Sequence, residues 1–495
     1  MNSGNFSLET GLQYKRRMRR LTPLVYLGSN LISLTGVVLV TTAGILWLLL
    51  LPSWWRDDMS NPYLGILANT LLPILFFGGL ILIPAGIWRD AKKRHRAGET
   101  GPRIPRGGEL RKLAIFVSIT TFVNLVIGSQ LLYSAVSYMD SDAFCGKVCH
   151  TVMQPEYTAY SHSPHARVSC TDCHIGPGAP WFVKSKISGT GQLFAVLLNT
   201  YPKPIPSPVE ALRPARETCE RCHWPQRFSG DLFFVRTHFG NDEQNTPATT
   251  VALMRVGGQN WKGTVGIHGA HSSAQARMTY ISTDRRRQVI PQVTYTGPDG
   301  KSIVFNSTDA KVTPAELARG ETRTMDCMDC HNRPTHVFQL PENAVDQAMT
   351  QEKINPKLPF IKKQAIEVLR REYPDRATGT REIAGSLFSF YKTKFPTIDP
   401  GLVQNAVEAV QAIYLQNIFP EMKITWGTYP NNLGHMDFPG CFRCHDGNHT
   451  SSDGRTISND CATCHDLLAM DEKDPKVLNE LRMNQAPASN SGATK

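Results

Sequence analysis

Apolar residues are concentrated in the first 138 positions of the chain. Three stretches there contain no Lys, Arg, Asp or Glu: residues 24–52, 63–88 and 113–138. Each is longer than the roughly 20 residues that a helix needs to cross a bilayer. The pattern therefore predicts a mainly α membrane anchor of three transmembrane helices. The alternative, buried core helices of a soluble protein, rarely gives uncharged runs of this length with basic flanks.

The first apolar stretch resembles a signal peptide in one respect, because Lys15, Arg16 and Arg17 precede it. Its length exceeds the roughly 7–15 residues of a signal-peptide core. Trp54 and Trp55 follow it, and tryptophan is typical of the membrane–water interface. We therefore expect an uncleaved anchor.

Charged residues beside the spans predict their orientation. Residues 1–23 and 89–112 together hold 14 Lys and Arg against 4 Asp and Glu. By the positive-inside rule both segments stay in the cytoplasm, and a third crossing places the chain after residue 139 outside. Charge beside membrane spans also accounts for most of the net charge of +11, so the basic composition predicts no nucleic-acid partner.

A cysteine motif recurs after the third span. Two thiols three positions apart reach the two vinyl groups of one haem, and the adjacent His ligates its iron. Zinc would need four ligands around one ion, and its usual spacings differ. The five C-x-x-C-H motifs are Cys170, Cys173 and His174; Cys219, Cys222 and His223; Cys327, Cys330 and His331; Cys441, Cys444 and His445; and Cys461, Cys464 and His465.

A sixth segment has one extra residue and reads C-x-x-x-C-H, with Cys145, Cys149 and His150. Gly146 could absorb the longer loop. All 12 cysteines would then carry haem. The prediction is six covalent c-type haems, or five if residues 145–150 instead form a disulfide or an unused pair.

Covalent haem attachment tests the topology independently. In bacteria it takes place outside the cytoplasmic membrane, and all six motifs follow the third span. We therefore expect a multi-pass protein of the bacterial inner membrane with a cytoplasmic N-terminus and a periplasmic haem domain.

Six irons have twelve axial positions, of which the motif histidines fill six. His336 and His449 lie too close to their preceding motifs to serve the same iron easily, so each is expected to serve a neighbouring haem. Met153 follows the first motif and could ligate its iron or simply pack. The other candidate ligands, any one of which could be an ordinary surface or core residue, are His162, His165, His238, His268, His271, His336, His435 and His449.

The segments between the motifs predict little regular structure. Strand-like runs lie at 249–256, 278–282, 289–296 and 301–305, with a hairpin signal at 297–300. Apolar spacing near 3.6 predicts helices at 358–373 and 402–419. The expected divisions are 1–23 (cytoplasmic), 24–138 (transmembrane), 139–223 (haems one to three), 224–326 (a small β insertion), 327–485 (haem four, helices, haems five and six) and 486–495 (a disordered tail).

Residues 144–186 bear the strongest family pattern: the first motif after a span, then Met153, His162 and His165, the motif ending at His174, and Lys184 and Lys186. Over about residues 115–200 this resembles the NapC/NirT family of membrane-anchored multihaem quinol dehydrogenases. Segments 219–231, 325–336 and 425–449 resemble a larger subgroup, the ImcH-like inner-membrane cytochromes of metal-respiring bacteria.

The resemblance implies a membrane-bound cytochrome that oxidises menaquinol or ubiquinol and passes electrons along its haems to periplasmic acceptors. It implies that His162 or His165 ligates another haem. The family's first motif usually reads C-x-x-C-H-x-M, and both gaps are one residue longer here, so the ligation of haem one stays open. Residues that could take up quinol protons, or be plain surface charges, are Asp142, Lys147, Glu156, Lys184 and Lys186.

The expected partners are the membrane quinol pool, the lipid bilayer, and periplasmic c-type cytochromes or a membrane complex. Two other functions compete. One is a terminal reductase that binds a small substrate at an open haem, and the other is a passive electron-transfer or scaffold subunit. Electron flow in the reverse direction would use the same residues.

Overall fold

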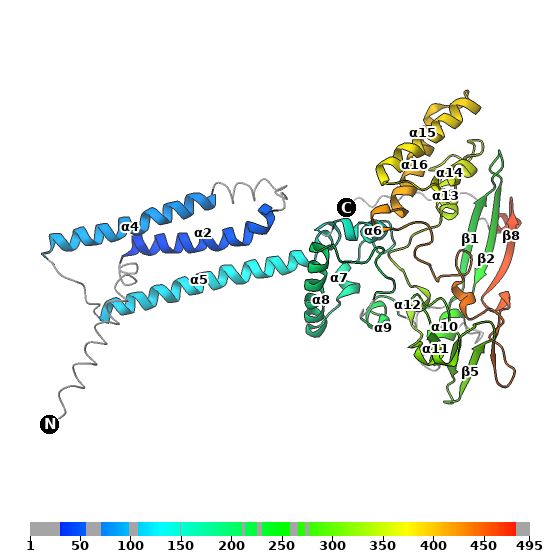
Figure 1. Cartoon of the computed structure of the whole chain (residues 1–495), viewed down its shortest axis with the longest axis horizontal. Helices are drawn as coiled ribbons and strands as arrows, with labels where there is room; N and C mark the ends of the chain where they lie inside the picture. Colours follow the sequence, from blue (N-terminus) through cyan, green and yellow to red (C-terminus); the bar gives the residue numbers. More distant parts are fainter. Residues whose placement is uncertain are drawn as a thin grey trace. The chain divides into compact units, whose positions relative to one another are not determined.

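The computed structural model describes residues 30–55, 71–98, 107–148, 150–209, 213–224, 230–257, 266–272 and 277–481 (Figure 1). The chain divides after Met139 into two units, which are described separately. Several predictions fall outside the described residues: the cytoplasmic segment 1–23, the N-terminal ends of the first two predicted spans, the middle of the basic loop, the attachment residue Cys149 and the tail 486–495.

In the described part of the N-terminal unit the chain forms helices α2 (Leu31–Trp55), α4 (Leu72–Arg96) and α5 (Gly107–Met139). Among the described residues, α4 alone is long and apolar enough to cross a membrane, and α2 contributes a shorter apolar stretch, Leu31–Trp47. A helical membrane-anchor candidate is therefore present. The count of three spans stays a prediction.

Helices α2 and α4 pack antiparallel through small residues. A Cβ on Gly36 or on Gly79 would come within 2.7 Å of the other residue's carbonyl oxygen. Ser33 Oγ donates to Ile83 O at 2.9 Å. Small residues let two helix backbones approach closely where lipid replaces water, so this pair suits a membrane setting.

Short helices begin the C-terminal unit. A π-helical turn η2 (Phe144–Val148) precedes α6 (His150–Ser161), α7 (Cys170–His174), α8 (Ala179–Leu197) and α9 (Ala215–Cys219). Gly146 is required in η2, because a Cβ there would meet the ring of Tyr157 at 2.0 Å. The extra residue of the first motif is therefore accommodated by a close approach of α6.

Two antiparallel sheets follow. One has the order β1-β2-β8, with β1 (Leu232–Phe239), β2 (Pro247–Met254) and β8 (His465–Glu472). The other has the order β6-β3-β4-β5-β7, with bounds Glu321–Thr324, Arg277–Ser282, Gln292–Thr296, Ser302–Ser307 and His449–Ser451.

The predicted hairpin at 297–300 is present, because β4 pairs with β5 and Gly297 N donates to Lys301 O. The division at 224–326 stays a prediction, but the strands of this segment do not form the two sheets by themselves. Both sheets take an edge strand, β7 or β8, from beyond residue 448. The sequence of a strand shows whether it alternates apolar and polar residues, but it does not show which distant strand it pairs with.

Four helices form a compact helical part: α13 (Pro341–Thr350), α14 (Ile361–Leu369), α15 (Arg376–Lys394) and α16 (Pro400–Asn417). Helices α14 and α16 match the predicted helices at 358–373 and 402–419. All four contribute fully buried side chains to one core, among them Val345, Ile361, Ile383 and Val410.

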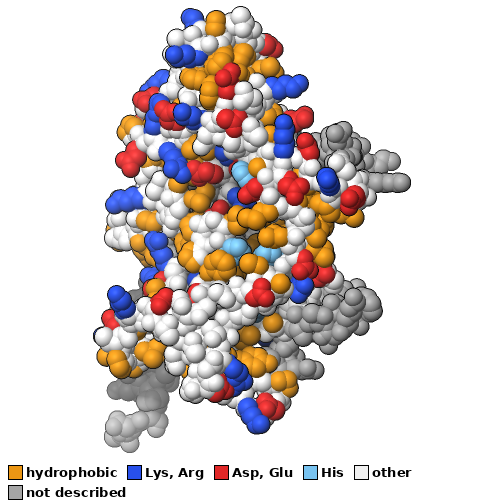
Figure 2. Space-filling view, turned by 90° about the vertical axis from the view of Figure 1, so that its right-hand side faces the viewer, with side chains coloured by type: hydrophobic (Ala, Val, Ile, Leu, Met, Phe, Trp, Pro, Cys, Tyr) orange, Lys and Arg blue, Asp and Glu red, His pale blue; other side chains and the backbone are white. Residues whose placement is uncertain are grey.

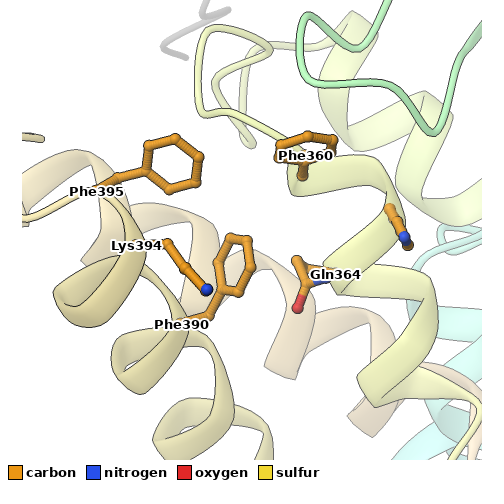
Figure 3. A pocket seen from close by; sticks show the side chains of 6 residues that line it. Phe360, Gln364, Phe390, Lys394 and Phe395 are labelled. Carbon is orange, nitrogen blue, oxygen red and sulfur yellow. The ribbon is translucent and has the colours of Figure 1, made fainter.

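A hollow of about 260 Å³ opens between α14 and α15, lined by Phe360, Lys363, Gln364, Phe390, Lys394 and Phe395 (Figure 3). No haem-motif residue lines it. The helical part therefore serves as a scaffold beside the motifs, and the candidate chemistry lies elsewhere.

Candidate haem centres

Each described C-x-x-C-H motif forms a single helical turn. The second motif is α7, the third begins at the end of α9, and the fourth lies in α12 (Cys327–Cys330). The fifth and sixth begin in the 3-10 turns η5 (Gly440–Arg443) and η6 (Cys461–Thr463). The turn carries two cysteines on neighbouring positions of one face and turns the following histidine toward the same side.

Main-chain hydrogen bonds close several of these turns. The backbone N–H of His223 donates to Cys219 O at 2.8 Å, and that of His331 donates to Cys327 O at 2.8 Å. His445 N donates to Cys441 O at 3.0 Å. These hydrogen bonds hold the two cysteines of each of these motifs in a fixed relative position, as attachment to the two vinyl groups of one haem requires.

Every C-x-x-C-H histidine faces one histidine from another part of the chain. The ring centroids lie between 5.8 and 6.3 Å apart. The pairs are His174 with His336, His223 with His165, His331 with His268, His445 with His271, and His465 with His435.

These separations fit two imidazoles on opposite sides of one iron. With a metal–nitrogen bond of about 2.0 Å and a ring centre about 1.1 Å beyond the nitrogen, the centroids of two imidazoles on one iron would lie about 6.2 Å apart. Rings in direct stacking contact come closer, as His435 and Phe442 do at 4.3 Å. The residues present therefore fit a haem held by two axial histidines at each of these motifs.

Hydrogen bonds orient several of these imidazoles. Nδ1–H of His336 donates to Glu156 O at 3.0 Å, and Nδ1–H of His271 donates to Ile267 O at 2.8 Å. His268 donates to Val256 O at 2.5 Å and His445 to Ser458 O at 2.7 Å. A carbonyl that accepts from Nδ1 fixes the tautomer and leaves Nε2 as the metal-binding atom.

Two further imidazole nitrogens are buried without a hydrogen-bond partner among the described residues: Nδ1 of His165 and Nδ1 of His465. A buried unpaired polar atom is uncommon and calls for an explanation. Both rings belong to the facing pairs, and an iron bound through Nε2 would leave these Nδ1 atoms without an acceptor among the described residues.

The first motif is described only in part. Cys145 lies in η2, Cys149 lies outside the described residues, and His150 is described as the first residue of α6 without its side chain. Met153 packs against an apolar cluster that includes Val152. Ligation at this motif therefore stays a prediction.

Three predicted ligands form no imidazole pair among the described residues. His162 is exposed, and its Nδ1–H donates to Thr158 O at 2.8 Å. His238 lies 3.7 Å from Asp471 Oδ1. His449 is buried with both ring nitrogens on oxygen acceptors, Asp446 Oδ1 at 2.9 Å and Ile290 O at 2.8 Å.

Thiols of successive motifs lie close together. Cys145 and Cys170 hydrogen-bond each other, as do Cys219 and Cys327. Burial and, after it, Asp172 and Cys222 raise the pKa of Cys173. Burial and then Cys441 raise the pKa of Cys330 to about 11, and the same two causes raise that of Cys464. Each motif is thus adjacent to the next, in the order of the chain.

Three of the candidate quinol-site residues already hold the structure together. Asp142 accepts from Cys170 N at 2.8 Å, and also from Ser169 and Tyr160. Burial acts to raise the pKa of Asp142, but these hydrogen bonds together lower it.

The acidic candidate Glu156 forms a buried ion pair with Arg333 at 2.8 Å, and the basic candidate Lys186 pairs with Asp140 at 2.5 Å. The remaining two candidates lie at the surface. Lys147 is exposed in η2, and Lys184 is exposed with its Nζ 4.6 Å from the centre of the Trp181 ring.

Arg333 is a residue that spacing did not single out. It is buried, donates to Glu156 and to the backbone oxygen of His336, and lies over the Tyr429 ring at 4.1 Å. It therefore fixes the segment that carries His336. The only feature of the sequence that pointed to Arg333 is its position three residues before His336. Its ion-pair partner Glu156 is 177 positions away in the chain, so no local pattern could identify the pair.

One face of the C-terminal unit shows histidine side chains at the surface among apolar ones (Figure 2). Large apolar side chains that are exposed near the motif histidines include Phe442, Met436 and Leu467. This surface suits the apolar body and edge of a bound porphyrin.

Comparison of the sequence with known proteins identifies several relatives of this chain. The model of the "NapC/NirT cytochrome c family, N-terminal region" matches residues 109–205. The chain is 39% identical over 447 residues to the cytochrome c-type protein ImcH of Geobacter sulfurreducens, covering 89% of this chain and 88% of that protein.

Shorter matches connect the chain to other cytochromes. It is 33% identical over 115 residues to the cytochrome c-type protein NrfH of Wolinella succinogenes, covering 22% of this chain and 62% of that protein. It is 31% identical over 85 residues to the cytochrome c-type protein TorC of Escherichia coli, covering 15% and 21%. No solved structure matches the chain.

Proposed function

Because the chain belongs to the NapC/NirT cytochrome c family, and within it to the ImcH-like proteins, we propose that it is a membrane-anchored quinol dehydrogenase with six c-type haems. In this proposal it oxidises menaquinol or ubiquinol at the periplasmic face of the bacterial inner membrane. It delivers the electrons to periplasmic c-type cytochromes or to a membrane complex, in respiratory or extracellular electron transfer.

The observation that carries the proposal is the set of five imidazole pairs. Each motif would supply two cysteines for thioether bonds and one histidine to the iron, and a distant segment would supply a second histidine. Bound haem supplies reversible one-electron chemistry at its iron. At the first motif, Cys145, Cys149 and His150 would hold the sixth haem, with Met153 as a candidate second ligand.

Paired ligands also favour electron transfer over substrate reduction. A terminal reductase needs an open axial position for its substrate. A histidine faces each of the five C-x-x-C-H histidines at a distance suited to closing that position. The adjacency of successive motifs, from Cys145 beside Cys170 to Cys441 beside Cys464, favours a continuous path for electrons.

Quinol oxidation releases two protons, so the quinol site needs polar groups near the first motif. Lys147 follows Cys145 by two positions and is exposed, and Lys184 is exposed on α8. Asp142, Glu156 and Lys186 are committed to structural contacts and are better suited to positioning the site than to moving protons. Lys147 and Lys184 are therefore the preferred candidates to contact quinol.

The test is reduction by quinol. The full-length protein in detergent is mixed with a reduced menaquinol analogue, and the reduced haem band is followed. We expect rapid reduction in the parent protein and in Lys357→Ala, a control at an exposed lysine in the helical part. Slower reduction is expected in Lys147→Ala and Lys184→Ala, with unchanged covalent haem content.

Reduction by dithionite provides the reference. If dithionite reduces the haems normally and quinol does not, the quinol dehydrogenase proposal is wrong for the isolated chain. A passive electron-transfer or scaffold subunit would then be the better description.

A further inference from the structure

Helix α8 (Ala179–Leu197) presents an apolar face that the C-terminal unit does not cover. None of its residues is buried. Val183, Ile187, Phe194 and Leu197 are exposed by 54%, 69%, 58% and 67%, and Leu198 just after the helix by 70%. A surface helix of a soluble domain would bury these side chains or replace them with polar ones.

The exposed apolar residues lie on one side of the helix. At about 100° per residue, the five of them fall within an arc of about 100°. Trp181, Ser185 and Val196 lie on the opposite side and are half-buried, and Val196 packs against the apolar cluster beneath. The helix therefore rests on its own unit by one side and turns a continuous apolar stripe away from it.

The polar residues around the stripe are those of an interfacial helix. Lys184 and Lys186 flank the stripe on either side, each about 80° from Phe194 near its centre. Lys184 Nζ lies 4.6 Å from the Trp181 ring centre, and Lys186 Nζ lies 4.9 Å from that of Phe182. Lysines beside an apolar stripe are typical of helices that lie in the plane of a membrane surface.

An ion pair connects α8 to the residue that directly follows α5. Lys186 Nζ pairs with Asp140 Oδ1 at 2.5 Å. Asp140 directly follows Met139, the last residue of α5. If α5 spans the bilayer, this ion pair links the middle of α8 to the first residue after that span.

We propose that α8 lies in the outer interface of the chain's own membrane, with the stripe of Val183, Ile187, Phe194, Leu197 and Leu198 in contact with lipid. This inference rests on the proposed function, because it requires α5 to be a membrane span. The proposed partner is the lipid bilayer, because the ion pair of Lys186 with Asp140 links the helix to the first residue after α5, and Lys184 is exposed beside the stripe.

A consequence for quinol follows. Lys184 and Lys186 then lie at headgroup depth, the level to which a lipid-soluble quinol brings its polar ring. Helix α8 would form part of the surface along which quinol approaches the first motif.

A photo-crosslinking experiment tests the contact with lipid. The full-length protein is reconstituted in phospholipid nanodiscs with p-benzoylphenylalanine at one position. Ile187 and Phe194 are the test positions within the stripe, and Ser188 is the matched control, exposed on the polar side of the same helix. Phe77 in α4, 58% exposed, is the reference position within a candidate span.

After illumination, mass spectrometry counts lipid adducts in variants whose haem spectra match the parent. We expect adducts at Ile187, Phe194 and Phe77, in yields several-fold above that at Ser188. Equal yields at Ile187 and Ser188, or adducts of the stripe with protein alone while Phe77 reacts with lipid, would overturn the inference. A lack of lipid adducts at Phe77 would instead overturn the proposed membrane anchor, and the inference with it.

Discussion

Replacing His271 by alanine tests the imidazole pairs directly. His271 lies in the short helix α10 (Ile267–Ser272), with its ring 5.8 Å from that of His445. In the proposed six-haem protein the variant would remove one of the two histidines of a single haem and leave the other four pairs in place. We expect about one sixth of the total haem to change from low-spin to high-spin, since a haem that loses one strong axial ligand becomes five-coordinate.

The substitution should leave the fold intact. Helix α10 contains no buried residue, and the hydrogen bond from His271 Nδ1 to Ile267 O is partly exposed. Losing one such bond costs about 0.5–1.5 kcal/mol. Electron paramagnetic resonance of the full-length protein in detergent measures the high-spin fraction, and intact mass measures covalent haem. A His271→Met variant should restore the low-spin signal at a higher reduction potential.

The matched control is His238→Ala. His238 is also half-buried but faces Asp471 rather than an imidazole, so its replacement should leave all haem signals unchanged. The pairing of His271 with His445 would be refuted by an unchanged low-spin signal in His271→Ala. It would also be refuted by an equal loss in His238→Ala.

Three further substitutions probe contacts around the motifs, each followed by thermal unfolding in detergent. Arg333→Ala leaves its buried carboxylate partner unpaired and should cost about 3–5 kcal/mol. Gly146→Ala places a methyl group 2.0 Å from the Tyr157 ring and should cost about 1–3 kcal/mol, whereas Gly189→Ala in open space should be neutral or stabilising. The pKa of Asp142 in the folded protein lies below its ordinary value of 3.8. The ionised Asp142 therefore stabilises the fold above pH 3.8, and this stabilisation is lost as the pH falls through the folded-state pKa. The difference in unfolding free energy between the parent and Asp142→Asn should be constant near neutral pH and vanish in acid.

Local patterns were sufficient to predict some elements. The hairpin of β4 and β5 has a turn sequence between alternating strands, and α16 has buried residues at helical spacing. Helix α15 was not predicted, because Gly379 and Gly385 interrupt its apolar pattern although Ile383, Leu387 and Tyr391 are buried every fourth position. Helix α8 was not predicted because its apolar residues face away from the protein and its interior contains two glycines.

The haem-attachment motifs could also be predicted from the sequence, because their residues are close together in the chain. The chemistry of one haem fixes two cysteines and a histidine within five positions, so their signal is local. The second axial ligand carries no such restriction. His336 was expected to serve a haem other than that of His331, and in the structure it faces His174. Which histidine it faces depends on the packing of α6 against the segment around Arg333, and no spacing encodes that.

These facing pairs also bear on how the part around the first three motifs holds together. The helical part has an extensive apolar core of its own. Among the described residues between 140 and 224, the buried apolar side chains are only Val152, Pro155, Ala159, Tyr160 and Ala215. Yet His165 and His174 in this stretch face partners in other segments, one of them beyond the fourth motif. An iron bound by both histidines of a pair would join these segments in the way that a hydrophobic core joins the four helices. We therefore expect folding of residues 140–224 to depend on haem far more than folding of the helical part.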